Sequence, residues 1–300
     1  IETSHPQWLV KRWTEQFGIE KTREMCETNI TAPHQSARVN TLRITVDELI
    51  DRLTEEGLTV QKSSIVPNAI ISLKGNLAKT AAFKDGLLTI QDESSMLVGH
   101  SLDVHEDFTV LDSCAAPGGK TTHIAQLMEG KGKVFALDLH KHKIKLINEN
   151  ASRLGLGNIE SKAHDSRRAG ELFAAESFDR ILVDAPCSGL GVLRRKPDIK
   201  YTKKESDLES LQTIQLQILE AVSPLLKKGG LLVYSTCTVD RNENQGTVKE
   251  FLDGNKEFQP FPLTHLPKTV QPFVEGNMLQ VFPQDFGGDG FFISCFKKDS

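Results

Sequence analysis

Two of the five cysteines each follow an apolar run and precede a turn. Cys237 lies in the stretch YSTCTVDRNEN, and Cys187 lies in the stretch VDAPCSG. The sequence has no CxxC pair and no HExxH motif, so we expect neither a zinc ribbon nor a thioredoxin-like site, and no metal. A thiolate is a strong nucleophile, although free cysteines often serve only as small packing residues. Two cysteines at neighbouring strand ends would face one cleft, which makes them candidates for covalent chemistry.

A second candidate is the stretch LDSCAAPGGKTT, which leaves a strand and enters a helix. Gly118 and Gly119 let the backbone turn sharply and approach a ligand, and the helix start offers free N–H groups. A P-loop needs a glycine where Cys114 stands, and the dinucleotide fingerprint GxGxxG is missing. S-adenosylmethionine has no phosphates, so a Gly-Gly pair is sufficient for it and a longer glycine-rich loop is not required. The expected cofactor loop comprises Cys114, Ala115, Ala116, Pro117, Gly118, Gly119 and Lys120.

Three acids follow later apolar runs. Asp138 ends the second run, where a carboxylate suits the two hydroxyls of a ribose. Asp165, in KAHDS, is placed to accept a hydrogen bond from an exocyclic amine such as adenine N6, and Asp184 ends the fourth run. A strand-end acid can also simply cap a helix. Because ligands of open α/β sheets bind at the carboxyl ends of strands, the set as a whole predicts a ligand site.

The elements that position these residues are strands alternating with helices. The apolar runs TVLDSC, KVFALDL, FDRILVDAPC and GGLLVYSTC are separated by helical segments such as HKIKLINENASRLG, and GFFISCFKK is a final strand. This alternation predicts an α/β fold with a mostly parallel, doubly wound sheet, whose strands are apolar because both faces are buried.

The first 95 residues follow a different pattern. Residues 5–29 predict two helices broken near Gly18, and Thr45 with Glu48 predicts a capping box at the start of a third helix. A strand, that helix and two further strands then make a small α+β module. We expect a boundary within residues 95–108, with an N-terminal unit over 1–95 and a catalytic domain over 96–300.

Composition narrows the class of protein. The chain has 300 residues, 38% hydrophobic and 25% charged, with a net charge of −4 and no apolar run that approaches the length of a membrane span. We therefore expect a cytoplasmic protein with reduced thiols. The basic segment after Cys187 is either a solvated loop or a phosphate-contacting loop, and its candidate contacts are Arg194, Arg195, Lys196 and Lys200.

Three motifs together resemble the RNA cytosine-5 methyltransferases: CAAPGGKT, DAPCSGLGVLRRKPDIK and YSTCTVDRNEN. The stretches SHPQWLVKRW and QDESS are similar to the bacterial Sun/Fmu-type branch, which acts on 16S ribosomal RNA. The resemblance implies a Rossmann-like, seven-stranded methyltransferase sheet preceded by an RRM-like module. It also implies a further N-terminal helical RNA-binding domain, which we expect this sequence, beginning at Ile1, to lack.

The resemblance also implies roles for the cysteines. C5 of cytosine is too weak a nucleophile to take a methyl group directly, but addition of a thiolate to C6 activates it. In the family the nucleophile belongs to the Thr-Cys motif, which assigns attack to Cys237 and release to Cys187. Asp184 is implied as a cofactor contact, with a contact to cytosine N3 as a second possibility. We expect Asp240 and Glu243 to form a capping box on a helix whose N–H groups favour the Cys237 thiolate, whereas the two acids oppose it.

Two other functions compete with methylation. A non-catalytic RNA-binding factor for ribosome assembly would keep the fold, but the intact cysteines and cofactor loop argue against it. A nicotinamide dehydrogenase is disfavoured by the missing GxGxxG motif. The expected partner is ribosomal RNA, with no membrane, and the expected state is a monomer.

Overall fold

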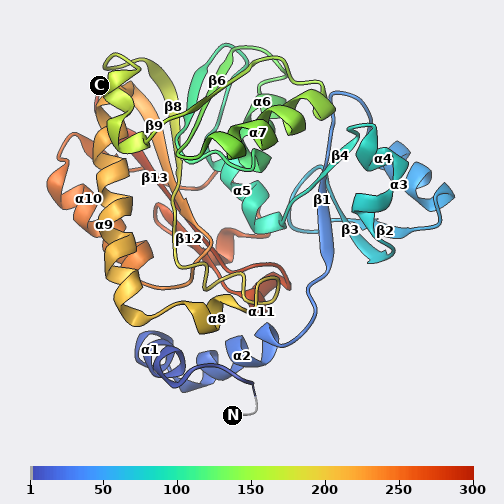
Figure 1. The fold of residues 1–300 in the computed structure, drawn as a ribbon, viewed down its shortest axis with the longest axis horizontal. Coiled ribbons are helices and arrows are strands. Elements are labelled where there is room, and N and C mark those ends of the chain that lie inside the picture. The colour runs from blue at the N-terminus through green and yellow to red at the C-terminus, as the bar shows by residue number, and fades with distance from the viewer. Residues whose placement is uncertain (1–2) are drawn as a thin grey trace.

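The computed structural model describes residues 3–300, which form two N-terminal helices, a small sheet and a large sheet (Figure 1). Helices α1 (Gln7–Phe17) and α2 (Ile19–Asn29) meet at Gly18, whose φ of 85° confirms the predicted break. Trp13 is fully buried and packs with Leu190 and Val239 of the large unit. Burial of a side chain of this size contributes about 1.5–3 kcal/mol. The helices are therefore fastened to the large unit.

The small sheet has four antiparallel strands in the order β2-β3-β1-β4 and lies apart from the large sheet in Figure 1. Thr45 and Glu48 form the predicted capping box on its main helix. This unit matches the predicted small α+β module. Its elements are β1 (Gln35–Val39), α3 (Val46–Glu55), β2 (Thr59–Lys62), β3 (Ala69–Lys74), α4 (Ala81–Lys84) and β4 (Leu88–Ile90).

The large sheet follows the order β11-β12-β13-β9-β8-β5-β6-β7, with β10 paired to β13. Strands β5 to β9 are parallel, and β13 runs antiparallel between β9 and β12. The predicted methyltransferase-type sheet is confirmed, with two very short strands, β10 and β11, added. The strands are β5 (Thr109–Asp112), β6 (Lys133–Asp138), β7 (Ile159–Ala163), β8 (Phe178–Asp184), β9 (Leu226–Thr236), β10 (Phe258–Pro260), β11 (Val274–Glu275), β12 (Met278–Val281) and β13 (Phe291–Lys298).

Helices cover both faces of this sheet because neighbouring strand residues point to opposite sides. Val110 packs toward Ile124 in one core, whereas the next residue, Leu111, packs toward Leu219 in the other. Figure 1 shows α5, α6 and α7 on the side toward the small sheet and α9 and α10 on the far side. The helices are α5 (Glu93–Ser101), α6 (Gly119–Leu127), α7 (Lys141–Leu154), α8 (Ile199–Thr202), α9 (Glu205–Val222), α10 (Thr247–Gly254) and α11 (Pro283–Phe286).

The parallel strands place all the sequence candidates at one edge. Asp138 and Asp184 end β6 and β8, and Cys237 directly follows β9. Asp165 follows β7 by two residues. Within residues 3–300, no helix combines the length and apolar character that a bilayer crossing requires.

Candidate active site

The predicted cofactor loop joins β5 to α6. Gly118 has a φ of 101°, and a Cβ on it would lie 3.1 Å from Cα of Ile147. This glycine therefore allows both the turn and the close approach of α7. A Cβ on Gly119 would lie 3.9 Å from Nε2 of Gln91, which is an ordinary van der Waals distance. The loop is held to β6 because the backbone N–H of Ala116 donates to Asp138 at 3.3 Å.

A first cavity of about 620 Å³ opens at this edge of the sheet. It gathers residues that the sequence predicted separately, from the loop, from the strand-end acids and from both cysteine motifs. Its lining includes Cys114, Ala116, Asp138, Asp165, Asp184, Cys187 and Cys237. Of the remaining loop residues, Pro117, Gly119 and Lys120 line a second cavity instead, and Ala115 and Gly118 line neither.

The three acids differ in how their carboxylates are engaged. Asp138 accepts backbone N–H groups of Ala116 and His140, one on each oxygen, and the Lys143 ammonium lies 3.6 Å from its Oδ1, longer than the Arg167–Asp165 contact. Asp165 is held by the guanidinium of Arg167, with Nη2–Oδ2 at 2.6 Å, and this contact lowers the pKa of Asp165. Asp138 thus keeps more capacity for a ligand than Asp165 does.

Asp184 lies at the centre of the edge. The Lys120 ammonium donates to its Oδ2 at 2.7 Å, and Ser235 Oγ donates to its Oδ1 at 2.8 Å. Asp184 therefore belongs to a fixed ion pair. It lines both the first cavity and the second.

The two candidate cysteines are neighbours: the sulfur atoms of Cys187 and Cys237 lie 3.4 Å apart. The hydrogen bond with Cys187 has the largest effect on the Cys237 thiol and, with a smaller effect of the Lys120 charge, lowers its pKa against burial and the charges of Asp184 and Asp289. The same contact and burial raise the pKa of Cys187 well above the ordinary value. The arrangement therefore favours a Cys237 thiolate beside a protonated Cys187.

The predicted capping box after Cys237 is wrong. The turn Asn242–Gly246 is π-helical, and Glu243 does not accept the backbone N–H of Asp240, which donates to Thr238 instead. Asp240 pairs with the guanidinium of Arg12 and accepts the Asn242 N–H at 3.0 Å. Glu243 is buried and accepts the backbone N–H of Ser188 at 2.9 Å. Asp240 thus keeps its local capping contact, whereas the Glu243 half of the predicted box is replaced by a contact with a distant part of the chain.

The second cavity, of about 450 Å³, lies against the first, and the two share Asp184, Lys196 and Cys237 as lining residues. Its remaining walls come from the small sheet, from the start of α5 and from the loop before β13. They include Ser36, Gln91, Asp92, Arg195, Asp289 and Phe291. A nucleophile on the shared wall can reach a substrate in either cavity.

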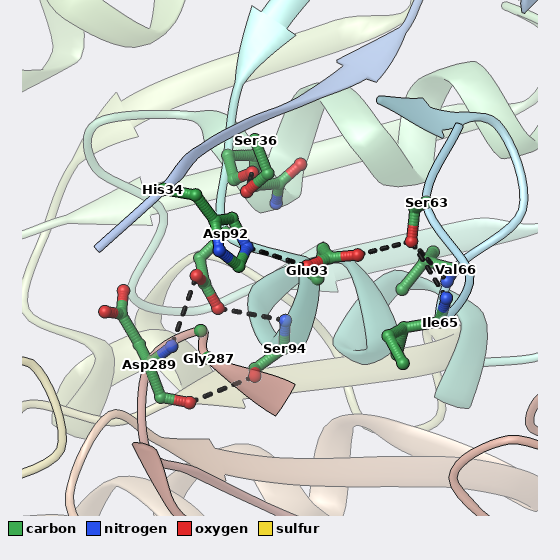
Figure 2. Close-up of polar contacts among 12 residues, drawn as sticks. His34, Ser36, Ser63, Ile65, Val66, Asp92, Glu93, Ser94, Gly287 and Asp289 are labelled. Carbon is green, nitrogen blue, oxygen red and sulfur yellow. Dashed lines mark hydrogen bonds and ion pairs between the residues drawn. The ribbon is translucent and has the colours of Figure 1, made fainter. Parts of the chain in front are cut away.

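Figure 2 shows how the start of α5 ties the small sheet to this wall. The Asp289 backbone N–H donates to Asp92 at 3.2 Å, and Ser94 Oγ donates to the Asp289 carbonyl at 3.1 Å. On the other side, Glu93 accepts from Ser63 and lies 3.3 Å from His34. Burial and the neighbouring Asp92 raise the pKa of Asp289 to about 6.

The two arginines of the basic segment make contacts within the protein. The guanidinium of Arg194 donates to the carbonyls of Gly287 and Ala32, and that of Arg195 pairs with Asp289 and Asp92. Both groups therefore brace the site internally.

The two lysines predicted as RNA contacts, Lys196 and Lys200, differ in their exposure to solvent. Lys200 is buried, with its ammonium 5.2 Å from the centre of the Tyr201 ring. Lys196 is exposed and lines both cavities. Arg195 also lines the second cavity, so both residues are available to a ligand there, and the RNA contacts expected of the segment stay a prediction.

Comparison with known proteins agrees with this geometry. A family model described as "16S rRNA methyltransferase RsmB/F" matches residues 100–297, and the ferredoxin-like domain of the RsmF/B-like methyltransferases matches residues 5–77. The probable ribosomal RNA small subunit methyltransferase B of Bacillus subtilis is 52% identical over 99% of this chain, and that of Synechocystis is 34% identical over 98%. This chain spans about two thirds of each of these relatives, 67% in both cases.

Two solved structures share the whole arrangement. NSun6 from Pyrococcus horikoshii, solved with SFG, an S-adenosylmethionine analogue, has a TM-score of 0.90 at 25% identity, with all of both chains covered. A methyltransferase homolog protein from the same organism has a TM-score of 0.85 at 31% identity, covering 99% of this chain and 96% of that one.

Proposed function

This chain belongs to the RsmB/F family of 16S rRNA methyltransferases, and we propose that it methylates C5 of a cytosine in small-subunit ribosomal RNA with S-adenosylmethionine. One observation carries the proposal: Cys237 lines both cavities, and a second thiol, that of Cys187 in the wall of the first cavity, lies 3.4 Å from it. The first cavity would take the cofactor and the second the target base.

The residues of the first cavity fit the cofactor. Its volume of about 620 Å³ is within the roughly 300–1,000 Å³ of small-ligand pockets. Asp138 would accept the ribose hydroxyls, because each of its oxygens accepts only one backbone N–H. Asp165 would accept the adenine amine, and Cys114 and Ala116 would line the pocket. The relative solved with SFG supports this assignment.

Cys237 is the proposed nucleophile. Its thiolate adds to C6 of the cytosine, and the electron pair of the C5–C6 double bond becomes available at C5. S-adenosylmethionine, when bound, supplies the methyl group that C5 takes up, and the S–CH3 bond breaks to leave S-adenosylhomocysteine. C5 then loses its proton to a water molecule acting as base, and the electrons of the C5–H bond restore the double bond as the Cys237–C6 bond breaks. Cys237 leaves as the thiolate, so each step is balanced.

Cys187 is the proposed release residue. Its raised pKa keeps the thiol protonated, so its S–H can donate to Cys237 whenever that sulfur is a thiolate. This hydrogen bond favours both formation of the nucleophile and its departure. It cannot form while Cys237 is a thioether, so it pulls the adduct toward release.

Asp184 and Lys120 form the floor between the two ligands. Because Asp184 lines both cavities, it can contact the methionine amino group or cytosine N3. A cytosine inside a helix cannot reach Cys237, so the target must be unstacked, and single-stranded RNA lowers that cost. Lys196 would hold the backbone of the unstacked nucleotide.

Both units take part in this proposal. The small sheet within residues 1–95 supplies Ser36 and Gln91 to the second cavity, and residues 96–300 supply the cysteines. We therefore propose that the target nucleotide is held between the N-terminal unit and the catalytic domain.

Methyl transfer to RNA tests the function directly. This chain, incubated with methyl-labelled S-adenosylmethionine and small-subunit rRNA, should place the label in 5-methylcytidine after digestion to nucleosides. The Cys237→Ala variant, folded and still binding cofactor, should place none. Label in a different nucleoside, or equal labelling by both proteins, would contradict the proposal.

A further inference from the structure

The peptide groups on either side of Cys187 are fastened to one buried pair of side chains. Gln215 Nε2 donates to the carbonyl of Pro186 at 3.0 Å, and the N–H of Ser188 donates to Glu243 Oε2 at 2.9 Å. Gln215 also donates to the same Glu243 oxygen at 2.9 Å. Gln215 and Glu243 are both fully buried. The loop that carries Cys187 is therefore gripped on both sides of the cysteine.

The peptide segment around Cys237 is held in the same way by one side chain. Thr236 Oγ1 donates to Asn244 Oδ1 at 2.6 Å, and Asn244 Nδ2 donates to the carbonyl of Thr238 at 3.0 Å. Asn244 is fully buried as well. It spans the cysteine by binding the residue before it and the residue after it.

Glu243 and Asn244 are consecutive residues of the π-helical turn Asn242–Gly246. Neighbouring residues of a helical turn point in different directions, so one turn sends one side chain to each cysteine loop. The turn itself is anchored because the hydroxyl of Tyr234, in β9, donates to the Glu243 carbonyl at 2.6 Å. π-helical turns are rare and occur frequently at functional sites.

The two loops are also joined to each other. Ser188 Oγ and Thr238 Oγ1 lie 2.8 Å apart, and the N–H of Gly191 donates to the carbonyl of Cys237 at 3.0 Å. A shift of either loop is therefore resisted by the other. The separation of the two sulfur atoms depends on this buried polar network, rooted in a single turn.

We propose that Glu243 and Asn244 are positioning residues that hold the two thiols at reacting distance, Glu243 acting on Cys187 and Asn244 on Cys237. The catalytic part of this inference rests on the proposed function. Removal of either side chain leaves buried backbone groups without partners, and the loop relaxes to satisfy them. Misplacing a reacting group by about 1 Å can lower turnover on the order of 100-fold.

Thiol bridging measures the separation without RNA. Dibromobimane, a short reagent with two thiol-reactive arms, becomes fluorescent when it links two neighbouring cysteines. The wild-type chain should bridge Cys187 to Cys237, whereas Glu243→Ala and Asn244→Ala should bridge several-fold more slowly. Asn242→Ala is the matched control, because its side chain lies on the same turn but is exposed.

Assays of adduct formation and release distinguish the role of Glu243 from that of Asn244. Glu243→Ala should slow release and accumulate a protein–RNA adduct, as Cys187→Ala should, whereas Asn244→Ala should fail to form the adduct. Glu243→Gln retains an oxygen that can accept the Ser188 N–H, so it should recover bridging and most of the turnover. The Glu243→Gln variant also allows the positioning role to be tested if Glu243→Ala does not fold. Cofactor binding, followed by calorimetry, should persist in all variants.

Two outcomes would overturn the inference. Bridging at the wild-type rate in both alanine variants would show that the turn does not set the thiol separation. A fall in turnover that tracks only the folded fraction, with no change in adduct, would make the residues purely structural. If Cys187→Ala also forms no adduct, the proposed function fails, while the bridging result still decides the positioning of the thiols.

Discussion

Replacing Asp138 by asparagine should weaken cofactor binding strongly, and the structure permits an estimate of how much. Each Asp138 oxygen accepts one backbone N–H, from Ala116 or His140, and the Lys143 ammonium is 3.6 Å from Oδ1, beyond hydrogen-bond distance, which leaves roughly one further acceptor site on each oxygen for a ribose hydroxyl. A hydrogen bond to a charged group contributes about 1.5–3 kcal/mol. Asparagine removes the charge and one acceptor, so we expect a loss of about 2–3 kcal/mol, or roughly 30- to 150-fold in Kd.

Asp165→Asn is the matched comparison. The Asp165 carboxylate is already paired with Arg167, so its removal should cost about 1 kcal/mol, or roughly fivefold in Kd. Isothermal titration of S-adenosylmethionine into both variants measures the two effects under one set of conditions. An unchanged affinity in Asp138→Asn, or a larger loss in Asp165→Asn, would refute the assignment of the ribose to Asp138.

Three further predictions concern pH, RNA and the nucleophile. Burial raises the pKa of Asp112 to about 7 in the folded chain, so ionisation of Asp112 destabilises the fold as pH rises from about 4 to 7. Across that window, the free energy of urea unfolding of Asp112→Asn should rise by about 2–4 kcal/mol relative to wild type. Parallel pH dependences of the two proteins would contradict this. Lys196→Ala should flatten the salt dependence of RNA binding by up to ~0.7 in log–log slope, whereas Lys228→Ala, exposed at the start of β9, should leave the slope unchanged. Lys120→Met should shift the pH profile of Cys237 alkylation upward, because the Lys120 ammonium helps to lower the thiol pKa; an unmoved profile would remove Lys120 from the stabilisation of the thiolate.

The sequence predicts this fold well where the determinants are local. The Thr45–Glu48 capping box and the break at Gly18 depend on residues within one or two turns of each other. The strands of the large sheet are recognisable because burial on both faces requires continuous apolar runs. The segment between α10 and β13 carries no comparable signal, since β10 and β11 are only three and two residues long.

The same logic explains the errors at the site. Glu243 follows a turn in the right place for a cap, but its partner, the Ser188 N–H, is 55 residues away in the sequence. Arg195 is exposed as the basic run suggests, but its partners Asp92 and Asp289, each about a hundred residues distant, could not be foreseen. Ion pairs and hydrogen bonds across the fold have no periodic sequence signature, so charge patterning alone cannot assign these side chains.

The order of the two cysteines is the central claim, and denaturing electrophoresis of RNA-incubated variants tests it most directly. Cys187→Ala should still attack C6 and then release slowly, so it should accumulate a covalent protein–RNA band when cofactor and small-subunit rRNA are present. Cys237→Ala, and the double variant, should give no such band. A band from Cys237→Ala but not from Cys187→Ala would reverse the two roles, and continued methylation by both single variants without any band would show that the reaction is not covalent.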